Sequence, residues 1–393
     1  MKKVFLFSLF LVLGLVLSQC LPVWLGEAFL TAEKVAKTLM FVCLAFIMIN
    51  VGREFELDKT KWRSYDADYF IAMATAAVPW IMVAFYYMFL LPADLFGNWD
   101  AWKENLLLSR FAAPTSAGIL FTMLAAAGLR REWIYKKTQV LAIFDDLDTI
   151  LLMIPLQIFM IGFKWQLFAV VIVITFLLVI GWKKLGTIRL SQTWKSILFY
   201  AVCIVAVTES IYLLTKWMMG ADGAIHIEVL LPAFVLGMVM KTVHQHGNRD
   251  EKITGMISYL FMFLVGLSTP QFIGIDHGHR ITEAVGIIAA QPMPSWEVLV
   301  VHVIVVTLLS NLGKMFPLFF YRDRQLEERL ALSVGMFTRG EVGAGIIVIA
   351  MGYNLGGPAL IISVLSLVLN LLLTGGFVVI VKRLAQQAYG LKE

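Results

Sequence analysis

Three acidic residues lie together inside an apolar run, where ionised groups are expensive. Residues 140–157 read VLAIFDDLDTILLMIPLQ, which places Asp145, Asp146 and Asp148 within four positions. An ionised side chain in the middle of a membrane span costs about 3 kcal/mol on insertion scales, so such a residue predicts a functional site. Carboxylate oxygens bind protons and hard cations, and the expected chemistry is therefore cation or proton binding.

A basic residue is expected at the same depth as these acids. Lys314 lies in the run SNLGKMF, eight residues before Arg322, and Asp145 lies eight residues after Lys137. At 1.5 Å per helical residue, both side chains start about 12 Å into the membrane from the same side. Opposite charges at one depth can keep each other ionised, so we expect Lys314 to pair with Asp145. Asn311, in the same run, is expected to support this site.

Two further apolar runs carry features that break a helix. Residues 335–345 read GMFTRGEVGAG, with Arg339 and Glu341 near the middle of the run among four glycines. Residues 111–118 read FAAPTSAG, in which Pro114 removes one backbone donor and frees a carbonyl one turn earlier. Interrupted helices with free backbone groups are how many transporters bind ions.

The composition requires many membrane crossings. Of 393 residues, 60% are apolar and 15% are charged, whereas soluble domains have roughly 25% charged residues. The net charge of +5 would suit nucleic-acid binding in a soluble protein, but here most basic residues lie in short loops. Apolar runs long enough to span can be centred on twelve positions: Val12, Cys43, Val78, Leu120, Leu152, Ile172, Val205, Phe234, Leu264, Val305, Gly345 and Leu369.

The basic residues orient these twelve spans. They concentrate in alternate loops, at 53–63, 130–137, 183–189, 241–252 and 322–329. By the positive-inside rule these loops and both termini are cytoplasmic. Spans 3–5 and 10–12 repeat the same order of elements, with the interrupted run in the middle of each trio. Their offset of seven spans predicts opposite orientations, which is an inverted repeat.

At these motifs the chain resembles the monovalent cation/proton antiporters, in particular their two-aspartate, sodium/proton-exchanging branch. The resemblance covers nearly the full length and is carried by Asp145-Asp146, by Lys314 and by Arg339-Gly-Glu-Val342. Residues 46–58 and 263–268 resemble the glycine-containing helix ends of that family. The resemblance implies an all-α polytopic membrane protein with an inverted-repeat sodium/proton antiporter fold and two broken crossing helices.

The resemblance also implies roles for individual residues. Asp146 would be the main cation and proton site, while Asp145 pairs with Lys314 and exchanges protons with it. Thr115 and the backbone at the two breaks would line the same cavity, with Arg339 and Glu341 in supporting electrostatic roles. The family further implies no cofactor and a homodimer, in which a core (67–162 and 296–384) moves against a scaffold (1–66 and 223–275) through linking helices (164–219).

Asp148 departs from the family pattern as a third acid. On a regular helix it lies about 60° round from Asp145 and about 160° from Asp146. It would therefore extend the side of the helix that faces Lys314. Lys314 could then share its proton between two acids, and the sequence leaves the charge stoichiometry open.

The expected function is exchange of Na⁺ or Li⁺ for H⁺ across the cell inner membrane by alternating access. K⁺/H⁺ exchange on the same scaffold and a membrane sensor without transport are the alternatives. An enzyme is not expected, because an intramembrane protease needs aspartates on two spans or a His-Glu-x-x-His helix. A nucleotide-driven pump is not expected either, because a Gly-rich phosphate loop ending in Lys-Ser/Thr is missing from the sequence. His302 and Glu209 also lie within spans and are expected to pair locally.

Overall fold

The structure is a computed structural model of the 393-residue chain. It describes residues 2–25, 28–53, 66–116, 129, 132–161, 172, 175–177, 179–181, 183–184, 186–219, 229–241, 248–268, 286–353 and 355–389. Within these ranges a few side chains are outside the description, among them those of Asp146 and Glu341.

Apolar runs in lipid must satisfy every backbone N–H and C=O internally, which favours helices. The described residues follow this rule, since they form helices joined by turns, with one isolated β-bridge between Ile188 and Met240. The α-helices are α1 (Lys2–Leu25), α2 (Ala28–Arg53), α3 (Asp66–Phe89), α4 (Trp99–Ser109), α6 (Trp133–Ile161), α8 (Trp194–Met219), α9 (Leu230–Val239), α10 (Asn248–Leu267), α11 (Trp296–Gly313), α12 (Leu326–Gly335), α13 (Glu341–Gly352) and α14 (Gly357–Tyr389). Short 3₁₀ turns are η2 (Ala93–Gly97), η3 (Arg110–Ala112) and η5 (Phe316–Phe319).

The helices agree with the spans that the sequence predicts wherever the structure describes them. Ten of the twelve expected centres fall within α1, α2, α3, α6, α8, α9, α10, α11, α13 and α14. Ile172 is helical as well, and Leu120 lies outside the described residues. Five of the described helical segments are by themselves long and apolar enough to cross a membrane, namely α2, α3, α8, α11 with η5, and α14.

The second expected helix break is present, and at the first the helix ends as expected, while residues 117–128 beyond it lie outside the described residues. Helix α4 ends at Ser109, the 3₁₀ turn η3 follows, and residues 113–116 are not helical. On the other side, α12 ends at Gly335 and α13 begins at Glu341, so residues 336–340 form a gap between two half-helices. Local signals start these half-helices: Asn98 caps α4 by accepting from the Asp100 N–H, and Gln325 and Glu328 form a capping box at α12.

The span that carries Lys314 differs from the expected regular helix. Helix α11 ends at Gly313, Lys314 is its C-cap, and η5 continues the chain only as a 3₁₀ turn that contains Pro317. Pro317 has no N–H to donate to the carbonyl of Gly313 four residues earlier, which favours the change of helix type here. The depth estimate for Lys314 assumed 1.5 Å per residue as far as Arg322, and that assumption is wrong after Gly313.

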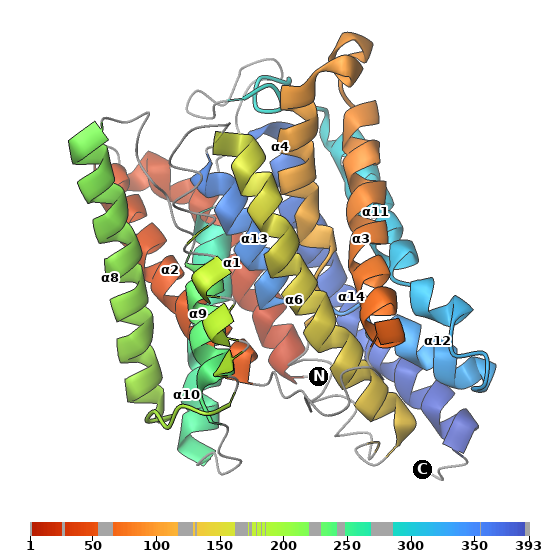
Figure 1. Ribbon diagram of the computed structural model, residues 1–393. Coiled ribbons are helices and arrows are strands. Elements are labelled where there is room, and N and C mark those ends of the chain that lie inside the picture. The colour runs from red at the N-terminus through yellow and green to blue at the C-terminus, as the bar shows by residue number, and fades with distance from the viewer. Residues whose placement is uncertain are drawn as a thin grey trace.

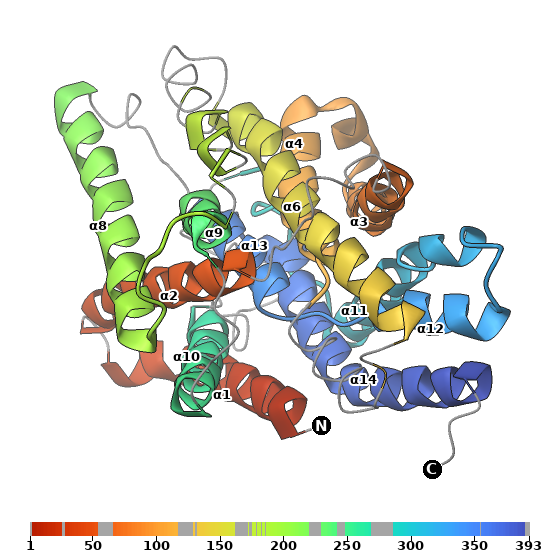
Figure 2. The same cartoon turned by 60° about the horizontal axis from the view of Figure 1, so that its bottom comes forward.

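The helices form two neighbouring groups (Figures 1 and 2). One group contains α1, α2, α8, α9 and α10, in which α1 packs on α10 and α2 packs on α9 and α8. The other group contains α3, α4, α6, α11, α12 and α14, in which α3 lies against α4, α6 and α11 while α14 lies against α11 and α12. Helix α13 lies between the groups in both views.

Glycines allow very close helix crossings in the first group. A Cβ on Gly14 of α1 would overlap the carbonyl oxygen of Phe263, and one on Gly266 of α10 would overlap that of Leu11. The α2–α9 crossing repeats this arrangement with Gly52 and Gly237. Small residues let helix backbones approach closely in a membrane, where apolar burial against lipid gives little driving force.

Candidate functional site

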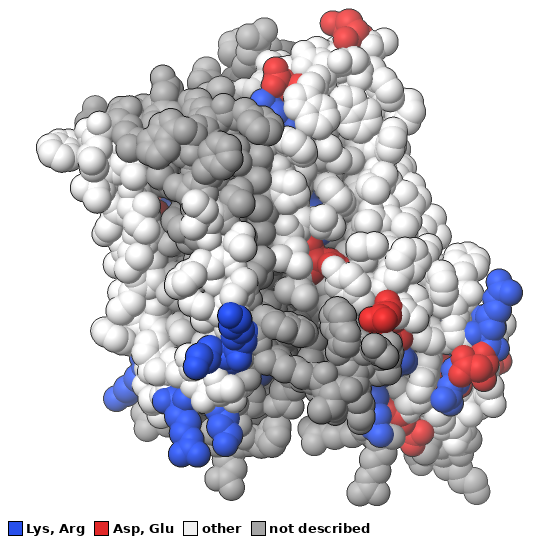
Figure 3. Space-filling model, in the orientation of Figure 1, with Lys and Arg blue, Asp and Glu red and all other residues white. Residues whose placement is uncertain are grey.

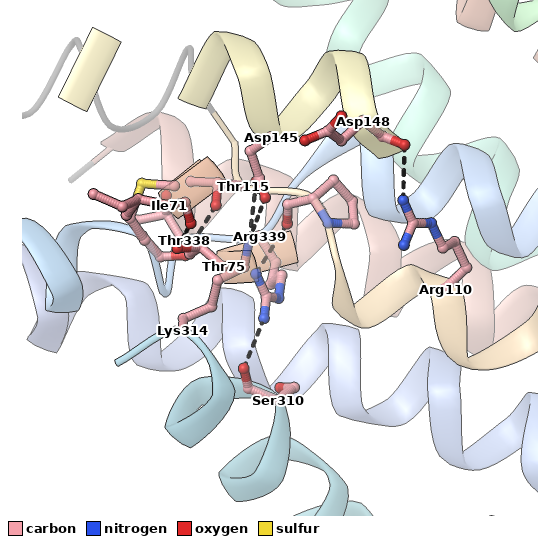
Figure 4. A network of polar contacts seen from close by, with 12 residues as sticks. Ile71, Thr75, Arg110, Thr115, Asp145, Asp148, Ser310, Lys314, Thr338 and Arg339 are labelled. Atoms are coloured by element: carbon pink, nitrogen blue, oxygen red, sulfur yellow. Dashed lines mark hydrogen bonds and ion pairs between the residues drawn. The ribbon is translucent and has the colours of Figure 1, made fainter. Parts of the chain in front are cut away.

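The Asp145 carboxylate and the Lys314 ammonium form a fully buried ion pair. Lys314 Nζ donates to Asp145 Oδ1 at 2.7 Å and to Oδ2 at 2.9 Å, and neither side chain has any solvent exposure (Figure 4). Asp145 comes from the middle of α6 and Lys314 from the end of α11. The contact predicted from the sequence is therefore present, although the helix on the lysine side is shorter than expected.

The end of α11 favours a cation at Lys314. The Lys314 N–H bonds the Asn311 carbonyl at 3.0 Å as the helix closes, so the ammonium belongs to the residue that caps the C-terminus. A helix C-terminus carries partial negative charge, which stabilises a nearby positive group. Gly313 allows this position, because a Cβ there would lie 2.5 Å from the Cα of Pro79 in α3.

The two breaks cross and bond to each other. The Ser116 N–H donates to the Thr338 carbonyl at 2.8 Å, and the Thr338 hydroxyl donates to the Ser116 carbonyl at 3.4 Å. Thr115 is fully buried, and its hydroxyl donates to the Met336 carbonyl at 3.1 Å. Backbone groups that the broken helices leave free are thus partly satisfied across the crossing.

Arg339 joins both breaks to the lysine-bearing helix. Its Nη1 donates to the Pro114 carbonyl at 2.9 Å and its Nη2 donates to the Ser310 carbonyl at 3.1 Å. The side chain is buried, and Figure 4 shows it beside the Asp145–Lys314 pair. A buried guanidinium that binds backbone carbonyls both neutralises their partial charge and fixes three segments in one arrangement.

Asp148 has its own partners in the described part of the chain. Its Oδ1 accepts from the Tyr69 hydroxyl of α3 at 2.9 Å, and its main-chain carbonyl accepts from Arg110 Nη2 at 2.9 Å. Arg110 is fully buried, and its guanidinium lies 4.3 Å from the ring centre of Trp80. Asp148 is therefore held by α3 and by the first break, whereas the ion pair of Lys314 is with Asp145.

Arg110 was not singled out from the sequence. The span was centred on Leu120, which placed Arg110 at its edge, where basic residues are ordinary. Helix α4 begins at Trp99, so this arginine lies well inside the crossing element. A charged residue four positions before Pro114, within apolar neighbours, was the signal that could have identified it.

Asn311 acts through a second asparagine. Asn311 and Asn370 exchange amide hydrogen bonds at 3.4 and 3.3 Å, and Asn370 also donates to the Phe337 carbonyl at 3.3 Å. Asn311 thereby helps to fix the break before α13. Asn370 lies in the apolar run of α14, and its uncharged amide gave no sequence signal.

The other two polar residues singled out within spans, His302 and Glu209, lie on α11 and α8, away from the ion pair. His302 Nδ1 lies 2.8 Å from the Tyr86 hydroxyl of α3, as expected for a local pairing. Glu209 is half-buried on α8.

Comparison with known protein families shows the family of the chain. The profile described as "Sodium/hydrogen exchanger, transmembrane" matches residues 2–385. The chain belongs to this family. It is therefore a multi-pass membrane transporter that exchanges a cation for protons, and not an enzyme.

Solved structures show the same fold for this exchanger. The sodium proton antiporter MjNhaP1 from Methanocaldococcus jannaschii at pH 8 aligns with a TM-score of 0.60 and 13% identity, covering 98% of this chain and 92% of that one. A structure of MjNhaP1 from an electron-microscopy map aligns over the same shares at 13% identity, with a TM-score of 0.51. A search of curated protein sequences finds no match.

Two expected site residues of the exchanger lie outside the described side chains. Asp146 follows Asp145 on α6, and Glu341 is the first residue of α13. Their backbone positions place Asp146 next to the ion pair along the helix and Glu341 directly after the second break. Their roles in ion binding stay predictions.

Proposed function

We propose that this exchanger moves Na⁺ or Li⁺ against H⁺, with both ligands competing for the carboxylate of Asp146. The buried Asp145–Lys314 pair is the observation that supports the proposal. The Lys314 ammonium balances the charge of Asp145, which leaves the neighbouring Asp146 as the carboxylate that can bind a cation or a proton. A carboxylate that holds a proton binds a cation poorly, and the reverse also applies. Competition for one group therefore couples the two fluxes.

Alternating access follows from the cost of moving charge through an apolar barrier. The empty, ionised Asp146 would be expensive to carry between the two sides, whereas the protonated or cation-bound form is compensated. The binding site then switches from one side of the membrane to the other only when a proton or a cation is bound. Exchange driven in this way needs no nucleotide.

Oxygen atoms at the crossing support a cation next to Asp146. The Thr115 hydroxyl donates a hydrogen bond to the Met336 carbonyl, so the lone pairs of the hydroxyl oxygen can still bind a cation. Carbonyl groups of the non-helical residues supply further hard oxygen ligands, which alkali cations prefer. The crossing of the two breaks is stabilised in this scheme by Arg339, Glu341 and Asn311. Asp148 joins α6 to α3 and to Arg110.

We further propose that the exchanger lies in the cell inner membrane with cytoplasmic termini and works as a homodimer. Figure 3 shows, on the face in view, Lys and Arg side chains gathered toward the end at which Figure 1 places both termini, as the positive-inside rule requires. The mobile core would comprise 67–162 and 296–384, which include the second helix group. The scaffold of 1–66 and 223–275 would hold the dimer, and 164–219 would link the two.

The test is proton flux in proteoliposomes that contain the purified protein. An imposed pH gradient is dissipated by adding Na⁺, Li⁺ or K⁺ in turn, with the membrane potential clamped. We expect wild-type protein to respond to Na⁺ and Li⁺, and Asp146→Asn to lose exchange while it keeps its melting temperature. Exchange by Asp146→Asn at near wild-type rate would overturn the assignment.

Asp94→Asn is the matched control, because Asp94 is an exposed acid in the turn η2 and its loss should leave exchange unchanged. A response to K⁺ that exceeds the response to Na⁺ would replace the sodium assignment by K⁺/H⁺ exchange. Wild-type protein without flux for any cation would overturn the exchange proposal and favour the alternative of a membrane sensor without transport.

A further inference from the structure

A second cluster of charged and aromatic side chains lies away from the ion pair, near the starts of α3 and α6 and beyond the end of η5. Asp68, in the first turn of α3, is 6% exposed. Lys137 Nζ of α6 donates to both of its carboxylate oxygens, at 2.9 and 2.8 Å, and the Tyr321 hydroxyl donates to Oδ1 at 2.7 Å. We call Asp68, Lys137 and Tyr321 the Asp68 cluster.

Aromatic side chains cover part of this cluster. The Lys137 ammonium lies 5.0 Å from the ring centre of Tyr321, and the Trp133 ring meets Tyr321 edge-on at 5.5 Å. Arg324 in turn lies 5.1 Å from the ring centre of Trp133. Cation–π contacts and a charge-assisted hydrogen bond are each stronger where water is largely excluded.

The backbone at Tyr321 is held in an unfavourable conformation. Its φ is 53°, and among the described residues it is the one non-glycine with a positive φ. Such a conformation costs on the order of 1 kcal/mol or more and persists only where surrounding contacts require it. Burial raises the pKa of Tyr321 well above its ordinary value, and the bond to Asp68 raises it further, so the hydroxyl keeps its proton and stays a donor.

The cluster joins the two segments that carry the ion pair. Lys137 precedes Asp145 by eight residues on the continuous helix α6, which is about 12 Å. Tyr321 follows Lys314 by seven residues, beyond the point where α11 has ended. Asp68 bonds both from α3, and α3 packs against both α6 and α11. After Gly313 the chain continues as turns and η5, which packs against α3 and α12. The Tyr321–Asp68–Lys137 bonds add a direct polar link from this segment to α6.

We infer that Asp68, Lys137 and Tyr321 are positioning residues for exchange, which hold Lys314 against Asp145 and so shape the cation site beside them. This inference rests on the proposed function. The cluster touches no transported ion in this scheme and acts through the registration of α6 with the segment that follows α11. Partners that orient ion ligands from outside typically change affinity by about 10–100-fold when removed.

The test measures Na⁺-dependent exchange in proteoliposomes and separates the apparent KM for Na⁺ from the maximal rate. We expect Asp68→Asn and Lys137→Gln to raise the KM by about tenfold. Tyr321→Phe keeps the ring contacts and loses one hydrogen bond, so it should raise the KM less and remain folded. The exchanged pair Asp68→Lys with Lys137→Asp should recover only part of the wild-type KM, because it restores the ion pair but leaves the Tyr321 hydroxyl without its carboxylate acceptor.

Lys136→Gln is the matched control, since Lys136 is the neighbouring, exposed lysine on α6 and its loss should leave the KM unchanged. A merely structural role would lower the amount of active protein, and hence the maximal rate, at constant KM. A wild-type KM in Asp68→Asn, Lys137→Gln and Tyr321→Phe would therefore overturn the positioning role while leaving the proposed function intact. Absence of Na⁺-dependent proton flux in the wild-type protein would instead contradict the proposed function.

Discussion

The Asp145–Lys314 contact places two opposite charges where neither side chain meets solvent. Removing both groups from water costs several kcal/mol per ion, and their attraction offsets this only because the geometry is close and doubly bonded. The end of α11 adds a favourable partial charge near the ammonium. The pair therefore contributes little net stability, while each member alone would be a strongly destabilising buried charge.

Two variants test this balance, one without Lys314 and one without either member of the pair. We expect Lys314→Met to lower the free energy of unfolding by about 3–5 kcal/mol, because it leaves the Asp145 carboxylate buried without its ammonium partner. Adding Asp145→Asn should restore most of that loss, since the uncompensated charge is gone. Thermal unfolding in one detergent measures both variants, and a double variant no more stable than Lys314→Met would contradict the interpretation.

At the scale of elements, helix ends and breaks decide where these residues meet. The breaks could be predicted because Pro114 and the glycines at 335–345 are local signals, and the Asp145–Lys314 contact because ionised residues in apolar runs are rare. The early end of α11 also has a local signal, Pro317, which the apolar run on either side of it concealed. The partner of Asp148 could not be predicted, because Tyr69 belongs to another helix far away in the sequence.

Gly313→Ala tests whether close approach of α3 sets the position of Lys314. A Cβ would lie 2.5–2.7 Å from Pro79 atoms, and Pro79 is inside a helix that cannot move without disturbing its neighbours. We expect a loss of about 1–3 kcal/mol in stability, as for other overpacked sites, together with a raised KM for Na⁺. Melting temperature and flux report the two effects.

The control for that change is Gly375→Ala on α14, where a Cβ would meet nothing within 4 Å. Alanine is favoured over glycine in a helix by about 1 kcal/mol, so this variant should be equal to or more stable than wild type. If Gly313→Ala behaved in the same way, the α3–α11 approach would not be limiting.

At the scale of the whole molecule, the two glycine crossings support an inverted repeat beyond the two trios that suggested it. With an offset of seven spans, the first and second spans correspond to the eighth and ninth, which are α9 and α10. The α1–α10 crossing then corresponds to the α9–α2 crossing, and Gly14 and Gly266 correspond to Gly237 and Gly52. Each crossing has reciprocal overlaps with carbonyl oxygens, which agrees with this correspondence, and the inverted repeat stays a prediction.

Variants at these crossings test whether the first helix group affects the ion site in the second group. Gly266→Ala and Gly52→Ala each place a methyl group against a carbonyl of the partner helix, so we expect each to lower stability by about 1–3 kcal/mol. Gly255→Ala, on α10 where a Cβ would be in open space, should not. Neither crossing contributes a residue to the Asp145–Lys314 site, and folded Gly266→Ala protein should keep the wild-type KM for Na⁺. A raised KM in this variant, comparable to that of Gly313→Ala, would mean that the first helix group shapes the ion site directly and is not a separate scaffold.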